Sequence, residues 1–311
     1  MTPPDLLSDR LACPACRLPV RWGNGIVTCT GCSRVFPIRD GVPFMLDDDS
    51  RSAFSDRMAM AENAQLRERL SRHGWLLRAL QVIRPPHPFL FTKGRRNREI
   101  FSSMLTLGGG QPVTLDIGSG ISGKTNVSGL SPSVLSGRIG LEIGNSPTAH
   151  VVGDAHRLPF LDGKVDGVMI QGVLEHVVDP VCIVNEIYRV LRPGGAIYAD
   201  VPFLQHYHQD PEDYRRFTLP GLRQLFTRFE ETDAGVSAGP SSALCDLLTE
   251  YPAVWFNNPI FYWGTKWILG WFVLPIRCLD YIFAGRSRSA SLAGAFYFLG
   301  QKQRGIADGA S

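Results

Sequence analysis

Four cysteines close to the start of the chain have the spacing of a metal site. They form two C-x-x-C pairs separated by twelve residues: Cys13, Cys16, Cys29 and Cys32. Zn²⁺ prefers four thiolate or imidazole ligands in a tetrahedron, and a hairpin at Asn24-Gly25 would bring the two pairs together. Four thiolates leave no position for a catalytic water. We therefore predict a structural Zn²⁺ that replaces the core which about 35 residues cannot build. The alternative, a redox pair, would need a thioredoxin-like context that is absent here.

A glycine-rich turn after an apolar run could bind a nucleotide. The run Leu115-Asp116-Ile117 leads into Gly118-Ser119-Gly120, and glycines let a ligand approach the backbone. The glycine spacing also matches the dinucleotide fingerprint, with Glu142 as the later acidic residue. However, the carboxylate of Asp116 would repel a pyrophosphate and attract a sulfonium cofactor with a free amino group. The segment after the turn is also a poor helix, so the sequence favours the sulfonium cofactor.

Two further carboxylates follow apolar runs. Glu142 ends the second run and can accept hydrogen bonds from both hydroxyls of a ribose. Asp154 ends the third and can accept from an adenine amino group. Ligands in open α/β sheets bind beyond the carboxyl ends of the strands. We therefore expect these side chains to meet at one edge of a sheet.

Such a sheet is predicted by alternating segments between residues 99 and 239. Five short apolar runs bounded by glycine alternate with helical or loop connections, which indicates a parallel α/β fold. Residues 180–195 predict a helix that stops at Pro193-Gly194-Gly195. A further strand-like run, SLAGAFYFLGQKQ, follows near the end of the chain. Residues 47–98 predict a helical linker that leads into this domain.

The composition fits a globular protein of about two domains. The chain has 311 residues, with 44% hydrophobic and 20% charged residues. Its 32 basic and 29 acidic residues leave a net charge of +3, which does not by itself favour a nucleic-acid partner. The N-terminus lacks the pattern of a secretory signal, so we expect a cytoplasmic protein.

Five segments occur in an order that resembles a known family. LDIGSG, LEIG, GDAHRLPF, VDGVMIQGVLEHVVDP and LRPGGAIYADVPF resemble the class I S-adenosylmethionine-dependent methyltransferases, over roughly 99–239 and again at 292–302. The resemblance implies a Rossmann-like sheet of seven strands, the last antiparallel, in a domain over 99–304, with S-adenosylmethionine as cofactor. Many members carry a third glycine where this chain has Ser122.

The resemblance also implies the cofactor contacts. It places Asp116, Gly118 and Gly120 along the methionine portion, Glu142 at the ribose, Asp154 and Ala155 at the adenine, and Gln171 at the methionine end. Residues 10–46, with the four cysteines and FPIRDGVPFML, resemble the small zinc-ribbon family that activates methyltransferases. In that family the ribbon is not itself catalytic.

The methyl acceptor would lie beside a loop rich in histidine. His206 and His208 follow the fifth strand, and His176 follows the fourth. A hydroxyl acceptor must lose a proton, and histidine is the natural base near neutral pH. We predict these three histidines as candidate bases. Two alternatives stay open: Asp213, Tyr214 and Arg216 only brace the loop, or no general base is used.

An aromatic insertion occupies residues 240–290, between the last two strands. Its uncharged core, from Trp267 to Ile276, has ten residues, whereas a membrane-spanning helix needs about 20. Tryptophan, tyrosine and flanking cations over 251–284 suit the water–lipid interface of the inner membrane surface. A buried cap and a homodimer face remain alternatives.

We therefore predict a methyltransferase for a small or lipid-linked acceptor, such as a cell-envelope glycan, methylated on oxygen. The His-Tyr-His…Asp-Tyr-x-Arg-Phe-Thr pattern looks like that of bacterial methyltransferases found with cell-envelope glycan enzymes. One alternative is an RNA-base methyltransferase whose ribbon holds RNA, although the near-neutral charge argues against it and Gln171-Gly172-Val173-Leu174 replaces the Asn-Pro-Pro-aromatic motif. Another is a non-catalytic scaffold. An NAD-dependent oxidoreductase is disfavoured by Asp116.

Overall fold

The computed structural model describes residues 6–47, 89–106, 110–120, 127–208, 212–255 and 259–304. Most of the predicted helical linker, residues 48–88, lies outside these ranges, as does Ser122. The end of that segment leads into helix α5 (Gly94–Thr106).

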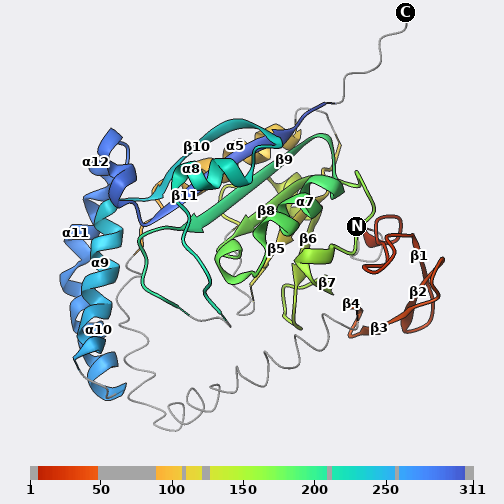
Figure 1. Ribbon diagram of the computed structural model, residues 1–311, viewed down its shortest axis with the longest axis horizontal. Coiled ribbons are helices and arrows are strands. Elements are labelled where there is room, and N and C mark those ends of the chain that lie inside the picture. Colours follow the sequence, from red (N-terminus) through yellow and green to blue (C-terminus); the bar gives the residue numbers. More distant parts are fainter. Residues whose placement is uncertain are drawn as a thin grey trace, which may run out of the picture.

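A single sheet of eleven strands organises the described residues, in the order β1-β2-β3-β4-β7-β6-β5-β8-β9-β11-β10 (Figure 1). The strands of its larger part are β5 (Thr114–Ile117), β6 (Arg138–Glu142), β7 (Val151–Gly153), β8 (Val165–Gln171), β9 (Leu191–Pro202), β10 (Phe229–Ala238) and β11 (Ala295–Lys302). Strands β5 to β9 pair in parallel, and β11 is antiparallel to both β9 and β10. The predicted seven strands are therefore present, with the last antiparallel.

The sheet is nevertheless larger than the predicted seven strands, because the cysteine-bearing ribbon adds four strands to it. The ribbon strands are β1 (Val20–Trp22), β2 (Ile26–Cys29), β3 (Val35–Arg39) and β4 (Val42–Met45). Strand β4 pairs in parallel with β7, with Phe44 opposite Val152. Asp47, which follows β4, also forms an ion pair with Arg157, which follows β7. An edge strand leaves unpaired backbone groups, and the ribbon covers the β7 edge.

Helices cover both faces of the sheet. Side chains of successive strand residues point to opposite faces, and β8 places Val168 and Ile170 in one core and Met169 in the other. The first core includes residues of α7 (Pro180–Val190) and α8 (Leu219–Leu225). The second includes residues of α5 and α6 (Pro132–Ser136). The sheet is thus the middle of three layers.

The structure differs from the sequence expectation in one helix boundary and one strand. Helix α7 ends at Val190, and Leu191 already belongs to β9, so Pro193-Gly194-Gly195 lies inside a strand rather than ending the helix. The pairing register of β8 and β9 shifts between Val165 and Gly167, which accommodates this irregular start. The sequence did not locate the residues of strand β10, because its first half, FEETD, carries exposed charges instead of an apolar run.

The aromatic insertion is a helical unit between β10 and β11. It comprises α9 (Pro240–Glu250), α10 (Pro259–Phe272), α11 (Leu274–Cys278) and α12 (Asp280–Phe283), with short 3₁₀ turns at Tyr251–Val254 and Ser287–Leu292. These helices and the ribbon lie at opposite ends of the molecule (Figure 1). Among the described helices, none is both long and apolar enough to cross a bilayer.

Candidate active site

The four cysteines converge as their spacing predicts. The Sγ atoms are 3.7 Å apart for Cys13 and Cys32, 3.3 Å for Cys16 and Cys29, and 3.7 Å for Cys16 and Cys32. Four sulfurs about 2.3 Å from a tetrahedral Zn²⁺ would lie roughly 3.8 Å from one another. Backbone N–H groups of Gly31 and Cys32 also point at the Cys29 sulfur, at 3.3 and 3.4 Å. The thiolate set therefore fits a structural zinc ion.

The glycine-rich turn leaves β5 in a conformation that favours glycine. Gly118 has a φ of +72°, and a Cβ built there would lie 2.3 Å from Val173 Cγ2. The Gly120 N–H donates to the carboxylate of Glu142. The carbonyl of Gly120 accepts hydrogen bonds from the hydroxyls of Ser146 and Thr148, both at 2.7 Å. The turn is thus held against the loop that follows β6.

Asp116 has a cationic partner within the protein. Arg138 Nε donates to its Oδ2 at 2.8 Å, and the carboxylate is only 7% exposed. Burial raises the pKa of Asp116, and the Arg138 guanidinium opposes that rise. The ion pair with Arg138 leaves less of this negative charge for a sulfonium cofactor than the sequence alone suggests. A direct cofactor contact by Asp116 remains a prediction.

The other predicted cofactor residues lie at the carboxyl ends of neighbouring parallel strands. Glu142 ends β6, Asp154 and Ala155 follow β7, and Gln171 ends β8. Asp154 caps the short helix η2 (Ala155–Arg157) by accepting from the His156 N–H at 2.9 Å. Gln171 Oε1 accepts from Arg98 at 3.3 Å. Carboxylate acceptors beside a glycine turn fit the ribose hydroxyls and amino groups of S-adenosylmethionine.

The loop after β9 is held by an ion pair. Arg216 donates to both carboxylate oxygens of Asp213 and to the carbonyl of His206. Asp213 also accepts the His208 N–H at 2.9 Å. Although burial acts to raise the pKa of Asp213, the hydrogen bonds from Arg216 and His208 lower it. Asp213 and Arg216 therefore form the predicted brace, whereas the Tyr214 side chain is exposed.

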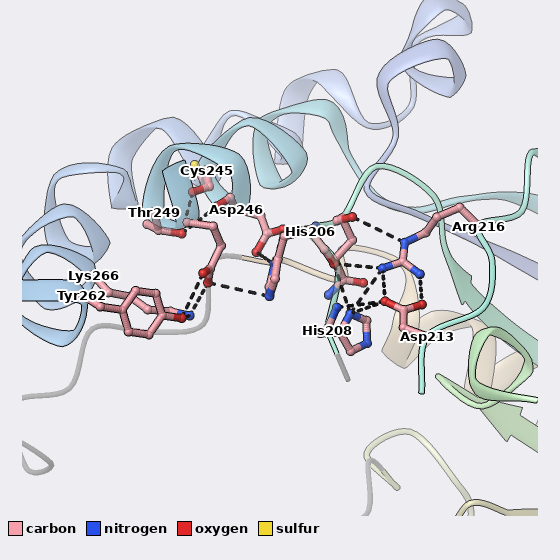
Figure 2. A network of polar contacts seen from close by, with 11 residues as sticks. His206, His208, Asp213, Arg216, Cys245, Asp246, Thr249, Tyr262 and Lys266 are labelled. Atoms are coloured by element: carbon pink, nitrogen blue, oxygen red, sulfur yellow. Dashed lines mark hydrogen bonds and ion pairs between the residues drawn. The ribbon is translucent and has the colours of Figure 1, made fainter. Parts of the chain in front are cut away.

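The brace presents His206 to the insertion. His206 Nδ1 lies 2.8 Å from Asp246 Oδ2, and the same oxygen accepts the His206 N–H at 2.9 Å (Figure 2). The hydrogen bond to Asp246 raises the pKa of His206, and desolvation opposes the rise. Asp246 belongs to α9, so a helix of the aromatic insertion orients the imidazole. An oriented histidine with a nearby carboxylate is the arrangement of a general base.

A second polar group of the insertion adjoins this dyad. Lys266 of α10 forms an ion pair with Glu250 of α9 and donates to the Tyr262 hydroxyl at 2.9 Å (Figure 2). Glu250 Oε1 is 3.8 Å from His206 Nε2. The sequence reasoning missed these residues, but one signal was present. Asp246 and Glu250 are four residues apart, which places both carboxylates on one face of a helix.

His176 and His208 pack together on the other side. Their ring centroids are 5.1 Å apart, and those of His206 and His208 are 5.8 Å apart. The structure therefore brings the three predicted histidines together. Glu175, which the sequence reasoning also missed, is buried beside His176, and burial raises its pKa to about 7. Burial lowers the pKa of His208.

Known proteins match the middle of this chain. Residues 133–199 match the family model of a methyltransferase domain. The demethylmenaquinone methyltransferase of Staphylococcus haemolyticus is 35% identical over 100 residues, covering 29% of this chain and 42% of that protein. That of Staphylococcus epidermidis is 32% identical over 127 residues, covering 38% and 51%. The chain thus spans about half or less of the length of these relatives.

Among solved structures, one similar chain is the 1,6-didemethyltoxoflavin-N1-methyltransferase of Burkholderia thailandensis with bound S-adenosylhomocysteine. It is 14% identical, with a TM-score of 0.40, and the alignment covers 91% of this chain and 99% of that one. The family match covers α6 to the middle of β9, the segment that carries Glu142, Asp154 and Gln171. The chain therefore contains a methyltransferase domain.

Proposed function

We propose that this protein transfers the methyl group of S-adenosylmethionine to a hydroxyl of a lipid-linked acceptor. The proposal rests on one observation: the predicted cofactor residues and the His206–Asp246 pair both lie at the carboxyl ends of the parallel strands. Three side chains that can accept hydrogen bonds from the cofactor lie there: Glu142 and Gln171 end β6 and β8, and Asp154 follows β7. The His206–Asp246 dyad follows the next parallel strand, β9. When bound, the cofactor supplies an electrophilic methyl group on a sulfonium.

The chain's own residues supply the proton chemistry. Asp246 holds the Nδ1 proton of His206, which leaves Nε2 to take the proton of an acceptor hydroxyl. The raised pKa strengthens the imidazole as a base but requires a higher pH for its neutral form. The Asp213–Arg216 brace fixes the loop, because Arg216 is bonded to the His206 carbonyl at 2.9 Å. The loop is therefore preorganised before an acceptor binds.

A methyl-transfer assay over a pH series tests the dyad. In the wild type, we expect the rate to rise with pH through a pKa above 6.5. The variant Asp246→Asn removes the carboxylate that raises this pKa, so the rising limb should move to lower pH. His206→Gln should lower kcat by about 10²–10⁴-fold without changing cofactor affinity. An unchanged pH profile in Asp246→Asn would refute the role of the dyad.

The lipid-linked acceptor is supported by exposed apolar side chains of the insertion. Large apolar side chains there are strongly exposed: Val254 78%, Trp255 68%, Phe272 74% and Tyr281 73%. Arg286 and Arg288, which follow Tyr281 in the sequence, are also exposed. Aromatic side chains beside cations suit an anionic lipid surface. The Staphylococcus relatives act on demethylmenaquinone, a lipid-linked quinone, which is compatible with such an acceptor.

Flotation with anionic phospholipid vesicles tests this surface. The double variant Trp255→Ala/Phe272→Ala should reduce the bound fraction at least tenfold, since each removes a large exposed ring. Leu18→Ala is the matched control, because Leu18 is 47% exposed on the ribbon at the other end. If the wild type does not bind vesicles but dimerises through Trp255 and Phe272, the face is a protein interface and the lipid proposal is wrong.

We also propose that the ribbon binds one structural Zn²⁺ through Cys13, Cys16, Cys29 and Cys32. The support is their mutual spacing, with all four Sγ atoms within 4.8 Å of one another. The ion would stabilise the ribbon, which joins the sheet through β4 and β7. Elemental analysis of the purified protein should find one zinc per chain.

A further inference from the structure

A second cluster of metal-ligand atoms lies beside the proposed acceptor site. Glu175, His176 and His208 each present one such atom, and these atoms lie within 4.8 Å of one another. Glu175 and His176 belong to the short helix η3 (Leu174–His176), which follows β8, and His208 lies in the loop after β9. Strands β8 and β9 are parallel neighbours. The fold thus brings together residues that are more than thirty positions apart in the sequence.

The hydrogen bonds of both imidazoles leave Nε2 for a ligand. His176 Nδ1 lies 2.5 Å from the carbonyl oxygen of Glu212, so Nδ1 carries the proton and donates it. His208 Nδ1 has the His206 carbonyl at 3.3 Å and Asp213 Oδ2 at 3.5 Å. Arg216 Nη2 is also 3.5 Å from this nitrogen, but it is bonded to Asp213. Metal-binding histidines characteristically donate their other N–H to a carbonyl or carboxylate.

The carboxylate of Glu175 has an unused ligand atom. Its side chain is 2% exposed, and among the described residues Oε2 has no hydrogen-bond partner. A buried polar atom without a partner is unusual, because it loses water and gains nothing in exchange. The nearest His176 nitrogen, Nε2, is 3.8 Å from Oε1, which is too long for a hydrogen bond. A cation bound by the Glu175 carboxylate together with the two histidines would give this carboxylate a partner.

The neighbouring cluster of His206, Asp246 and Glu250 is different. It also has three ligand atoms within 4.8 Å, but the ammonium of Lys266 already pairs with Glu250. His206 Nδ1 is engaged by Asp246 as well. Glu250 therefore already has a positively charged partner in the protein, so this cluster is the comparison for the first.

We propose that Glu175, His176 and His208 bind one divalent first-row transition-metal ion. Two imidazoles and one carboxylate suit ions such as Mn²⁺, Fe²⁺ or Zn²⁺, and three protein ligands leave coordination positions open. In methyl transfer, and resting on the proposed function, such an ion would polarise the acceptor hydroxyl as a Lewis acid next to His206. Binding of the ion itself does not depend on that function.

Paramagnetic resonance of Mn²⁺ tests the site in the full chain. The protein is first loaded with one zinc per chain, which the four thiolates take in preference to a nitrogen and oxygen site, so the second cluster stays open to Mn²⁺. Mn²⁺ is then titrated without cofactor, and the signal of the free ion is followed. We expect one Mn²⁺ per chain, and an affinity at least tenfold weaker in His208→Ala and in Glu175→Gln. The control His206→Ala, in the neighbouring cluster, should stay within threefold of the wild type.

The outcomes separate the proposals. Absence of any bound Mn²⁺, or binding that is lost in His206→Ala but kept in His208→Ala, would overturn the metal site. His208 is 29% exposed in its side chain, so His208→Ala should keep its melting temperature even if the buried Glu175→Gln does not. Cofactor affinity is measured calorimetrically on the same samples. A chain that binds Mn²⁺ but not S-adenosylmethionine would keep the metal site and refute the proposed function.

Discussion

Asp200 makes the stability of this protein depend on pH in an unusual direction. Its carboxyl group is buried at the end of β9, where it accepts hydrogen bonds from Ser237 Oγ at 3.1 Å and Tyr198 OH at 3.3 Å. Burial raises its pKa to about 7, and these hydrogen bonds and the charge of Arg98 only partly oppose the rise. The folded protein therefore keeps a proton on Asp200 that the unfolded chain releases.

The magnitude follows from the two pKa values. The unfolded value is 3.8 and the folded value about 7, a difference of roughly three pH units, each equivalent to about 1.4 kcal/mol. Asp200 favours the folded state fully below pH 3.8, and this contribution is lost as pH rises through 7. The loss between pH 4 and pH 8 should reach up to about 4 kcal/mol.

Urea unfolding of the wild type and Asp200→Asn between pH 4 and pH 8 isolates this effect. Asparagine is neutral at every pH, so the variant should gain stability relative to the wild type as pH rises. Asp213→Asn is the matched control, because hydrogen bonds from Arg216 and His208 lower the pKa of Asp213 below 3.8. The contribution of Asp213 therefore changes only below about pH 4, and the difference between wild type and this variant should stay nearly constant from pH 4 to pH 8. A difference between wild type and Asp200→Asn that does not change with pH would refute the reasoning.

Three further predictions concern the glycine turn, the ribbon and the proposed ribose contact. Gly118→Ala should lower the free energy of unfolding by about 1–3 kcal/mol, because φ is +72° and the added Cβ meets Val173 at 2.3 Å. The control Gly264→Ala, on an open face of α10, should be neutral or stabilising by up to about 1 kcal/mol. Thermal melts of both variants measure the difference. Cys16→Ser should remove the bound zinc and lower the melting temperature of the whole domain, since β4 pairs with β7; two separate transitions would contradict this. Glu142→Ala should weaken calorimetric binding of S-adenosylmethionine at least tenfold, and unchanged affinity would exclude its role at the ribose.

Local spacing explains which features were predictable. The thiolate cluster follows from two tight turns and a hairpin, all within twenty residues. The turn at Gly118 and Gly120 and the parallel strands before Glu142, Asp154 and Gln171 follow from short apolar runs bounded by glycine. Helices α9 to α12, between β10 and β11, lie within residues 240–290, the segment that the aromatic side chains mark.

Strand β10 and the end of helix α7 were harder to predict from the sequence. Strand β10 has an exposed acidic first half, so its alternation is weak. The helix before β9 ends earlier than its apolar spacing suggests, because Leu191 already pairs with Val165 of β8. In both places a neighbouring strand, rather than local propensity, decides the backbone.

By itself, the sequence determined the kinds of chemistry present: a thiolate cluster, a glycine turn with carboxylates, and a group of histidines. Only the tertiary structure decided which charges meet. It paired Asp116 with Arg138 across two strands, joined His206 to Asp246 forty residues away, and left Glu175 Oε2 without a described partner. The physical reason is that burial and ion pairing depend on distances across the sheet, which residue spacing along the chain does not encode.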